Sequence, residues 1–196
     1  MRKEITAPVR ERLLQAGVLV FSKSGFNGSS VQDITEAAGV PKGSFYNHFD
    51  SKEALGAAVV EYFWENKACH ALEILDQDTL EPIVRLRRYF EQVIQNVEGI
   101  GYTCGCFIGN MTAELSDHSA VISDQLSAAY ARWTRRIADC IKLAQQTGSI
   151  HSKADPDILA TFALNAWEGA LLRARVAKSS RPLQQFIDTL FTQLLN

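Results

Sequence analysis

The sequence has little that would serve secretion, membrane insertion or disulfide bonding. No apolar run reaches the roughly 20 residues that a helix needs to cross a bilayer. Residues 1–17 contain acidic side chains and an amphipathic pattern in place of the apolar segment of a signal peptide. The four cysteines include no Cys-x-x-Cys pair. We therefore expect a cytoplasmic protein without membrane contact, whose cysteines are free thiols.

An excess of one charge is also missing, since the formal net charge is −2. This balance disfavours a purely architectural DNA binder, which would be more basic. The charge is nevertheless uneven, because residues 1–52 hold seven Lys and Arg against five Asp and Glu, while the remainder holds thirteen against seventeen. A slightly basic N-terminal part on an acidic body indicates that nucleic acid would be contacted at that end.

The sequence offers no glycine-rich phosphate loop and no metal-ligand motif, so we expect neither a cofactor nor a metal ion. An enzyme is the alternative from another class. A helical thiol peroxidase would need a base beside its cysteine, and the histidine closest in sequence to Cys104 and Cys106 is His118. A peroxide-consumption assay separates the two classes, and we expect no enzymatic activity.

Proline is scarce, with 5 residues in 196, and apolar residues recur at spacings of three and four almost throughout. This pattern predicts an all-α protein of about nine helices. We expect a helix-turn-helix DNA-binding domain over residues 1–52 and a helical ligand-sensing and dimerisation domain over residues 53–196. The predicted helices cover about 8–24, 31–38, 42–49, 52–75, 80–97, a short segment with two cysteines that ends near 116, 119–147, 156–177 and 182–195.

Residues 31–49 have the proportions of a helix-turn-helix. Gly39 suits the tight turn, because glycine adopts the left-handed conformation at low cost. Phe45 and Phe49 lie four residues apart and should pack inward. The second helix of such a unit presents its N-terminal residues to base edges in the major groove, and here that start is Lys42-Gly43-Ser44.

The stretch GVPKGSFYNHFDSKEAL, residues 39–55, resembles the DNA-binding signature of the TetR family of transcriptional regulators. The resemblance covers residues 8 to about 60 and implies a DNA-binding regulator, commonly a repressor. It implies phosphate contacts from Ser30, the Tyr46–His48 pair and Lys52. The DNA-contacting residues expected from the motif and the resemblance together are Ser30, Lys42, Gly43, Ser44, Tyr46, Asn47, His48 and Lys52.

Useful sequence specificity needs two reading heads about one helical turn, ~34 Å, apart, so a homodimer on a palindromic double-stranded operator is expected. The last two predicted helices carry apolar stripes that could form the dimer interface or complete the core of the monomer. The TetR resemblance favours an interface. The residues expected there are Phe162, Ala166, Ala170, Phe186, Leu190 and Phe191.

Aromatic residues and Met in the middle helices could line an apolar pocket for a small-molecule inducer of unknown identity, although such residues are more often core. The candidates are Phe63, Trp64, Phe90, Phe107, Met111, Trp133 and Trp167. Three polar residues on mixed faces could anchor a ligand or bridge helices: Asn110, Glu114 and Asn165.

The stretch YTCGCFIGN, residues 102–110, places two cysteines one glycine apart. A metal clamp is disfavoured, because Cys-x-Cys supplies two ligands and zinc takes four. With Thr103 or Gly105 as the helix cap, we expect Cys106 in the first turn of the short helix, where backbone amides lower a thiol pKa and favour a sensor. Buried packing is the third interpretation, since free cysteine is among the most buried residue types.

The segment from Gly105 to Asp117 is similar to a branch of the TetR family that includes the repressor of the N-ethylmaleimide reductase gene. This resemblance implies an electrophile- or oxidant-sensing role for Cys106, with Cys104 as a resolving thiol or a bystander. An inducer at the larger domain would move the fourth helix and change the separation of the reading heads. The alternative is a non-covalent apolar ligand pocket with structural cysteines.

Overall fold

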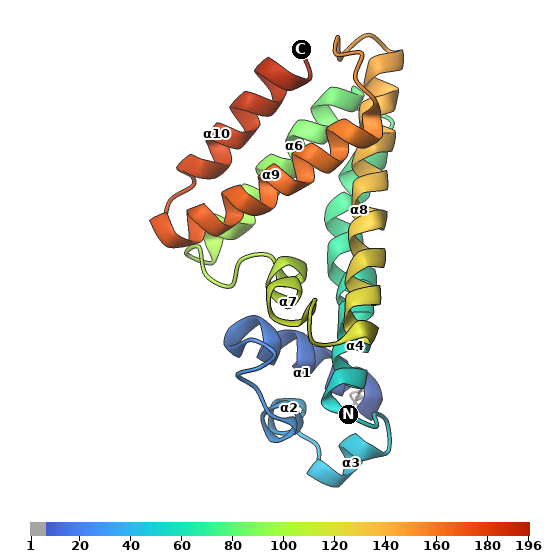
Figure 1. The fold of residues 1–196 in the computed structure, drawn as a ribbon, viewed down its shortest axis with the longest axis vertical. Coiled ribbons are helices and arrows are strands. Elements are labelled where there is room, and N and C mark those ends of the chain that lie inside the picture. Colours follow the sequence, from blue (N-terminus) through green and yellow to red (C-terminus); the bar gives the residue numbers. More distant parts are fainter. Residues whose placement is uncertain (1–6) are drawn as a thin grey trace, which may run out of the picture. The chain divides into compact units, whose positions relative to one another are not determined.

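The computed structural model describes residues 7–196, and among these it contains helices and no strand (Figure 1). Where adjoining elements run on without a break, they form nine helical segments, so the all-α prediction is confirmed. The α-helices are α1 (Val9–Ser24), α2 (Val31–Ala38), α3 (Lys42–Tyr46), α4 (Lys52–Phe63), α5 (Cys69–Leu72), α6 (Pro82–Gly99), α7 (Phe107–Leu115), α8 (Ala120–Gln146), α9 (Pro156–Ala177) and α10 (Arg181–Thr189). Two π turns, η1 (Trp64–Ala68) and η3 (Leu190–Leu194), and one 3-10 turn, η2 (Glu73–Asp76), continue them.

Capping residues explain the ends of α2. The Ser30 side chain accepts a hydrogen bond of 3.2 Å from the Asp33 amide, and the Asp33 carboxylate accepts one of 2.8 Å from the Ser30 amide. This reciprocal capping box satisfies two amides that the helix leaves unpaired. Gly39 ends the helix with a φ of 63°, as predicted.

Two predicted boundaries were wrong. The third helix ends at Tyr46 and not at Phe49. The short helix with the cysteines begins at Phe107, so both cysteines lie before it. The physical reason is the backbone, because Cys104 and Gly105 have φ values of 64° and 68° and cannot continue a right-handed helix.

The chain packs as two units. The N-terminal unit runs to Asn66 and also takes in Phe107–Ala129, and the C-terminal unit comprises Lys67–Cys106 and Tyr130–Asn196. These units are defined by how the helices pack. The sequence instead predicts a boundary at residue 52 between a DNA-binding and a ligand-sensing part, and that boundary stays a prediction.

In the N-terminal unit α1 packs against α2 and α4. Gly17 permits the close approach to α4, since a Cβ there would lie 2.6 Å from Val59 Cγ2. The buried side chains of this core include Leu13, Ile34 and Leu55.

In the C-terminal unit α9 packs against α10, and α10 also contacts α6, so the three helices lie together (Figure 1). Their contact centres on three aromatic rings. The Trp167 ring lies 4.9 Å from that of Phe90 and 5.1 Å from that of Phe186, centroid to centroid. No helix within residues 7–196 is long and apolar enough to cross a membrane.

Candidate functional site

Helix α3 presents a polar face on a rigid apolar base. Phe45 and Phe49 are buried, and their rings lie 5.8 Å apart. Their burial fixes the orientation of the short helix. Along the predicted reading segment Ser44 is half-buried, and the exposed residues are Lys42, Gly43, Tyr46, Asn47 and His48.

Gly43 has open space beside it. A Cβ at this position would meet nothing within 4 Å. The fold therefore does not require glycine here. A close approach of the α3 backbone to another molecule would require it, because a side chain would then stand in between.

Two of the predicted DNA contacts also have local structural roles. The Ser30 hydroxyl donates a hydrogen bond of 2.7 Å to Asp33 within the capping box, and Ser30 remains exposed. The Lys52 ammonium donates to the carbonyls of Phe26, at 3.0 Å, and Ser29, at 2.9 Å. It also lies 4.2 Å from the centroid of the Phe26 ring. The phosphate contacts of both residues stay predictions.

The loop between α1 and α2 is also held from α7. The Glu114 carboxylate accepts a hydrogen bond of 2.8 Å from the Asn27 amide. Gly25, with a φ of 76°, lies so close that a Cβ there would be 2.6 Å from Glu114 Oε1. Glu114 therefore ties α7 to the α1–α2 loop, and its role as a ligand anchor stays a prediction.

Cys106 directly precedes α7, is half-buried and belongs to the C-terminal unit. Its thiol donates a hydrogen bond to the carboxyl of Glu168 on α9. Burial raises the pKa of this carboxyl, and the hydrogen bond from Cys106 lowers it by a smaller amount. The Glu168 Oε1 atom is buried and makes no hydrogen bond within residues 7–196.

Sequence reasoning missed Glu168, although the sequence contained a signal. Between Ile158 and Leu172 it is the only charged residue. A lone carboxyl in an apolar helical stretch marks a side chain whose burial needs a partner.

Tyr89 and Trp133 lie close to this pair in the C-terminal unit. The Trp133 indole donates a hydrogen bond of 2.8 Å to the Tyr89 hydroxyl. Burial raises the pKa of Tyr89, the bond from Trp133 lowers it, and the charges of Cys106 and Glu168 raise it further. Those charge effects place the thiol and the carboxyl near the phenol.

The remaining thiols give no sign of a metal centre. Burial raises the pKa of the Cys140 thiol to about 11, and its Sγ donates to the Pro82 carbonyl at 3.2 Å. Cys140 is therefore a packing residue. In the part of the chain that the structure describes, no three His, Cys, Asp or Glu side chains are arranged to hold a metal ion.

The seven predicted pocket residues are divided between the two units. The N-terminal unit contains Phe63, Trp64, Phe107 and Met111, and the rings of Phe63 and Phe107 lie 4.6 Å apart. The C-terminal unit contains Phe90, Trp133 and Trp167, all buried. Core packing accounts for the contacts within each unit, and the role of these residues in ligand binding stays a prediction.

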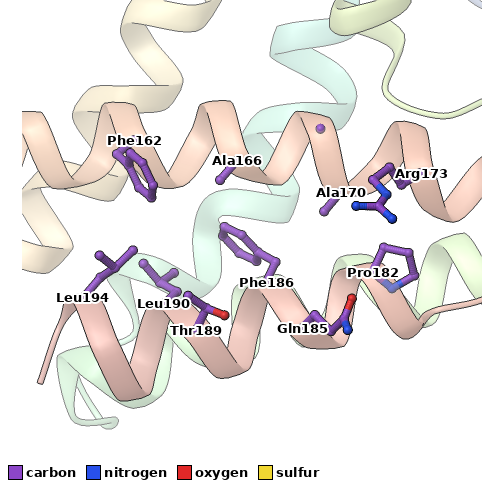
Figure 2. A pocket seen from close by; sticks show the side chains of 11 residues that line it. Phe162, Ala166, Ala170, Arg173, Pro182, Gln185, Phe186, Thr189, Leu190 and Leu194 are labelled. Atoms are coloured by element: carbon purple, nitrogen blue, oxygen red, sulfur yellow. The ribbon is translucent and has the colours of Figure 1, made fainter.

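Five of the six predicted dimer residues, all but Phe191, line a groove of about 390 Å³ between α9 and α10 (Figure 2). Phe162, at its edge, is 54% exposed. Ala170, Phe186 and Leu190 line the groove as largely buried residues, together with the half-buried Ala166. Phe191 is buried and packs under the Arg87 guanidinium, 4.2 Å from its ring centroid.

Family models match both parts of the chain. Residues 13–59 match the bacterial regulatory proteins of the tetR family, and residues 82–190 match the tetracyclin repressor-like C-terminal domain. The HTH-type transcriptional repressor DhaR of Mycobacterium sp. strain GP1 is 42% identical over 96% of this chain and 93% of its own length. The HTH-type transcriptional repressor NemR of Escherichia coli K12 is 28% identical over 94% and 92%.

Solved structures agree with these matches. The regulatory protein TetR from Rhodobacter sphaeroides superposes with a TM-score of 0.87 at 30% identity, over 94% of this chain and 98% of its own. The reduced form of E. coli NemR also reaches 0.87, at 26% identity, over 93% and 94%. The chain therefore belongs to the TetR family of bacterial regulatory proteins, and it is a DNA-binding transcriptional regulator.

Proposed function

We propose that this regulator is a cytoplasmic homodimeric repressor that binds a palindromic operator and leaves it when an inducer acts on residues 53–196. The observation that carries the DNA-binding part is the α3 surface. Its exposed Lys42, Tyr46 and His48 stand on a base of buried Phe45 and Phe49, and Gly43 leaves the backbone open to the groove. The relatives named above as repressors support the direction of regulation.

Fluorescence anisotropy tests the DNA-binding part, with the duplex upstream of the protein's own gene compared with a random duplex. Lys42→Ala and Tyr46→Phe should each weaken operator binding and leave the melting temperature unchanged, because both side chains are exposed. Each lost contact should raise Kd by about fivefold or more, which corresponds to ~1–3 kcal/mol. Unchanged operator affinity in both variants would contradict the assignment of α3.

Dimerisation is proposed through the face that α9 and α10 share. Two copies meeting here would bury Phe162 and fill the groove beside it, which lies in the C-terminal unit (Figure 2). Gly169 and Ala166 leave room for close helix approach. If this face pairs with the same face of a second copy, each of the two α3 helices can read one half-site of the operator.

We assign the inducer response to Cys106. The residue is half-buried, so it is not fully enclosed by the core, and α7 begins at the next residue. Through Glu114, α7 holds the loop that leads into α2. Displacement of α7 on modification of Cys106 would therefore release the loop that positions the reading helices.

The π turn at Trp64–Ala68 suggests where the fourth helical segment would bend. It lies where the two units divide, between Asn66 and Lys67. A π turn interrupts the regular hydrogen-bond ladder of a helix, so bending concentrates there. Such bending would change the separation of the two reading heads in a dimer.

Treatment with N-ethylmaleimide tests the sensor. Stoichiometric reagent should release the wild-type protein from its operator, and Cys106→Ser should bind DNA but ignore the reagent. Cys104→Ser is the matched control and should respond as the wild type does. Release of Cys106→Ser would point to Cys104 or to the second candidate, a non-covalent ligand among the aromatic residues of the middle helices.

A further inference from the structure

We propose that Glu168 is the proton acceptor for Cys106, so that the thiol adds to carbon electrophiles by transferring its proton to the neighbouring carboxyl. The inference deepens the proposed sensor function and rests on it. It concerns how the thiol reacts, and DNA release is a separate measurement.

The first support is the contact itself. The Cys106 thiol donates a hydrogen bond to the Glu168 carboxyl, so donor and acceptor of the proton are already in contact. The second carboxyl oxygen, Oε1, is buried without a hydrogen bond within residues 7–196. A carboxyl with so few donors around it gains from receiving a proton.

The second support is the electrostatic environment of the carboxyl. Burial raises the pKa of Glu168, which makes it a stronger base than a carboxylate in water. Burial raises the pKa of Tyr89, and the charges of Cys106 and Glu168 raise it further. The phenol therefore stays neutral and does not compete as a base at physiological pH.

The third support is the backbone before Cys106. Gly101, Tyr102, Cys104 and Gly105 have φ values between 56° and 68°, and two of these four are not glycine. A non-glycine residue in this conformation is strained and persists only where the surroundings enforce it. The segment is tied from the end of α9 as well, because Lys178 donates a hydrogen bond of 3.2 Å to the Tyr102 carbonyl. The thiol is thus held in place against the carboxyl.

The chemical step is balanced without a further reactant. Sγ bonds to the β-carbon of an α,β-unsaturated carbonyl compound, and the thiol proton passes to a Glu168 oxygen. The π pair of the carbon–carbon double bond shifts to the bond between the α-carbon and the carbonyl carbon, and the C=O π pair moves to the carbonyl oxygen, which gives an enolate. The protonated Glu168 then returns the proton to the α-carbon. The net result is addition of S–H across the double bond, and the carboxylate is restored.

The test is the pH dependence of Cys106 alkylation by N-ethylmaleimide, quenched with excess thiol and measured on the Cys106 peptide by mass spectrometry. Glu168→Gln keeps the shape but cannot accept a proton. It should slow alkylation at pH 6.5 by about tenfold or more, as expected for the loss of a general base. The two rates should converge above the ordinary thiol pKa of about 8.5, where the thiolate forms without help.

A matched variant separates the base from a merely structural tie. Lys178→Met removes the other link between the segment and the end of α9, and it should leave the shape of the pH profile unchanged. Glu168→Asp should retain part of the rate at pH 6.5, because it keeps a carboxylate. A Lys178→Met profile that matches that of Glu168→Gln would overturn the inference.

Two further outcomes would also overturn it. The first is alkylation of Glu168→Gln at pH 6.5 as fast as that of the wild type, or faster, which would mean that the carboxyl only holds the thiol neutral. If the variant does not fold, the wild-type profile decides alone. A tenfold rise in rate per pH unit from pH 5.5 to 8 would mean that thiol ionisation governs the reaction and that Glu168 takes no proton.

The fate of the operator complex distinguishes this inference from the proposed function. Glu168-dependent alkylation that leaves the protein on its operator supports the proton-transfer inference and rejects the sensor. Operator release by a reaction that is insensitive to Glu168→Gln supports the sensor and rejects the inference.

Discussion

The Glu114 carboxylate on α7 accepts a hydrogen bond of 2.8 Å from the backbone amide of Asn27, in the loop that leads into the helix-turn-helix. Lys52 holds the same loop from α4, through the carbonyls of Phe26 and Ser29. Glu114 on α7 and Lys52 on α4, two side chains of opposite charge, thus both hold this short loop. Because α3 follows α2 through a tight turn, this loop orients both helices of the reading motif.

The first prediction concerns Gly25. Gly25→Ala places a methyl group 2.6 Å from Glu114 Oε1 and forces alanine into a φ of 76°. It should lower the free energy of unfolding by ~1–3 kcal/mol. Glu114→Ala alone should cost ~1 kcal/mol, the typical value of one hydrogen bond. Urea unfolding of both variants and of the double variant measures these effects.

The double variant provides the control. Removal of the Glu114 carboxylate also removes the clash with the new methyl group, so the two costs should sum to more than the cost of the double variant. Strict additivity would show that strain at Gly25 is independent of Glu114 and would argue against this contact as the tie between α7 and the loop.

The second prediction concerns Gly43. Gly43→Ala should leave the free energy of unfolding unchanged or raise it by up to ~1 kcal/mol, because alanine favours a helix and the site is open. Operator affinity should nevertheless fall, because the methyl group would stand between α3 and the groove. Thermal melting and fluorescence anisotropy on the operator measure the two effects.

Gly17→Ala is the matched control on α1. There the added Cβ would lie 2.6 Å from Val59 Cγ2, so stability should fall together with DNA binding. A Gly43→Ala variant that keeps full operator affinity would mean that the α3 backbone does not approach DNA closely.

The helices could be predicted from the sequence wherever local chemistry decides them. The bounds of α2 and α9 are as predicted, because Ser30 with Asp33 and Asp155 with Pro156 fix their starts. The segment with the two cysteines could not be placed so well. Its helix begins one residue after Cys106, because a run of positive φ values precedes it, and nothing local in Tyr102 or Cys104 favours that conformation.

The site could be predicted only in part, for a related reason. A motif within a short stretch reveals α3, but partners far apart in sequence are invisible to spacing rules. Glu114 meets Asn27 across 87 positions, and the Glu168 partner of Cys106 comes from another helix. Lys52 shows the same limit, since its carbonyl contacts to the α1–α2 loop were not evident from its place at a helix start.

The third prediction concerns the groove between α9 and α10. Phe162→Glu should leave the monomer folded, because the side chain is 54% exposed, and should abolish dimerisation by placing two carboxylates in one interface. Analytical ultracentrifugation should show a monomer, and operator affinity should fall with it. Leu19→Glu, on an α1 side chain that is 62% exposed, is the control and should stay dimeric. A dimeric Phe162→Glu would move the interface elsewhere.

The fourth prediction concerns the Glu168 carboxyl and pH. Burial raises its pKa in the folded protein, whereas in the unfolded chain it titrates near the ordinary value of about 4.3. Between these two values the folded state binds more protons than the unfolded state, so this group stabilises the fold less as pH rises. Glu168→Gln cannot ionise. The unfolding free energy of the wild type minus that of Glu168→Gln should therefore decrease from pH 4.5 upward and level off above the folded pKa.

Urea unfolding at fixed protein concentration, in steps from pH 4.5 to 8, gives this difference. Asp139→Asn is the matched control, because Asp139 is exposed within α8. Its difference from the wild type should stay flat. If the Glu168 difference instead increases with pH, the ionised carboxylate is the form that the fold stabilises. Burial would then not dominate at this site, and the carboxyl that faces Cys106 would be a weaker base than the structure indicates.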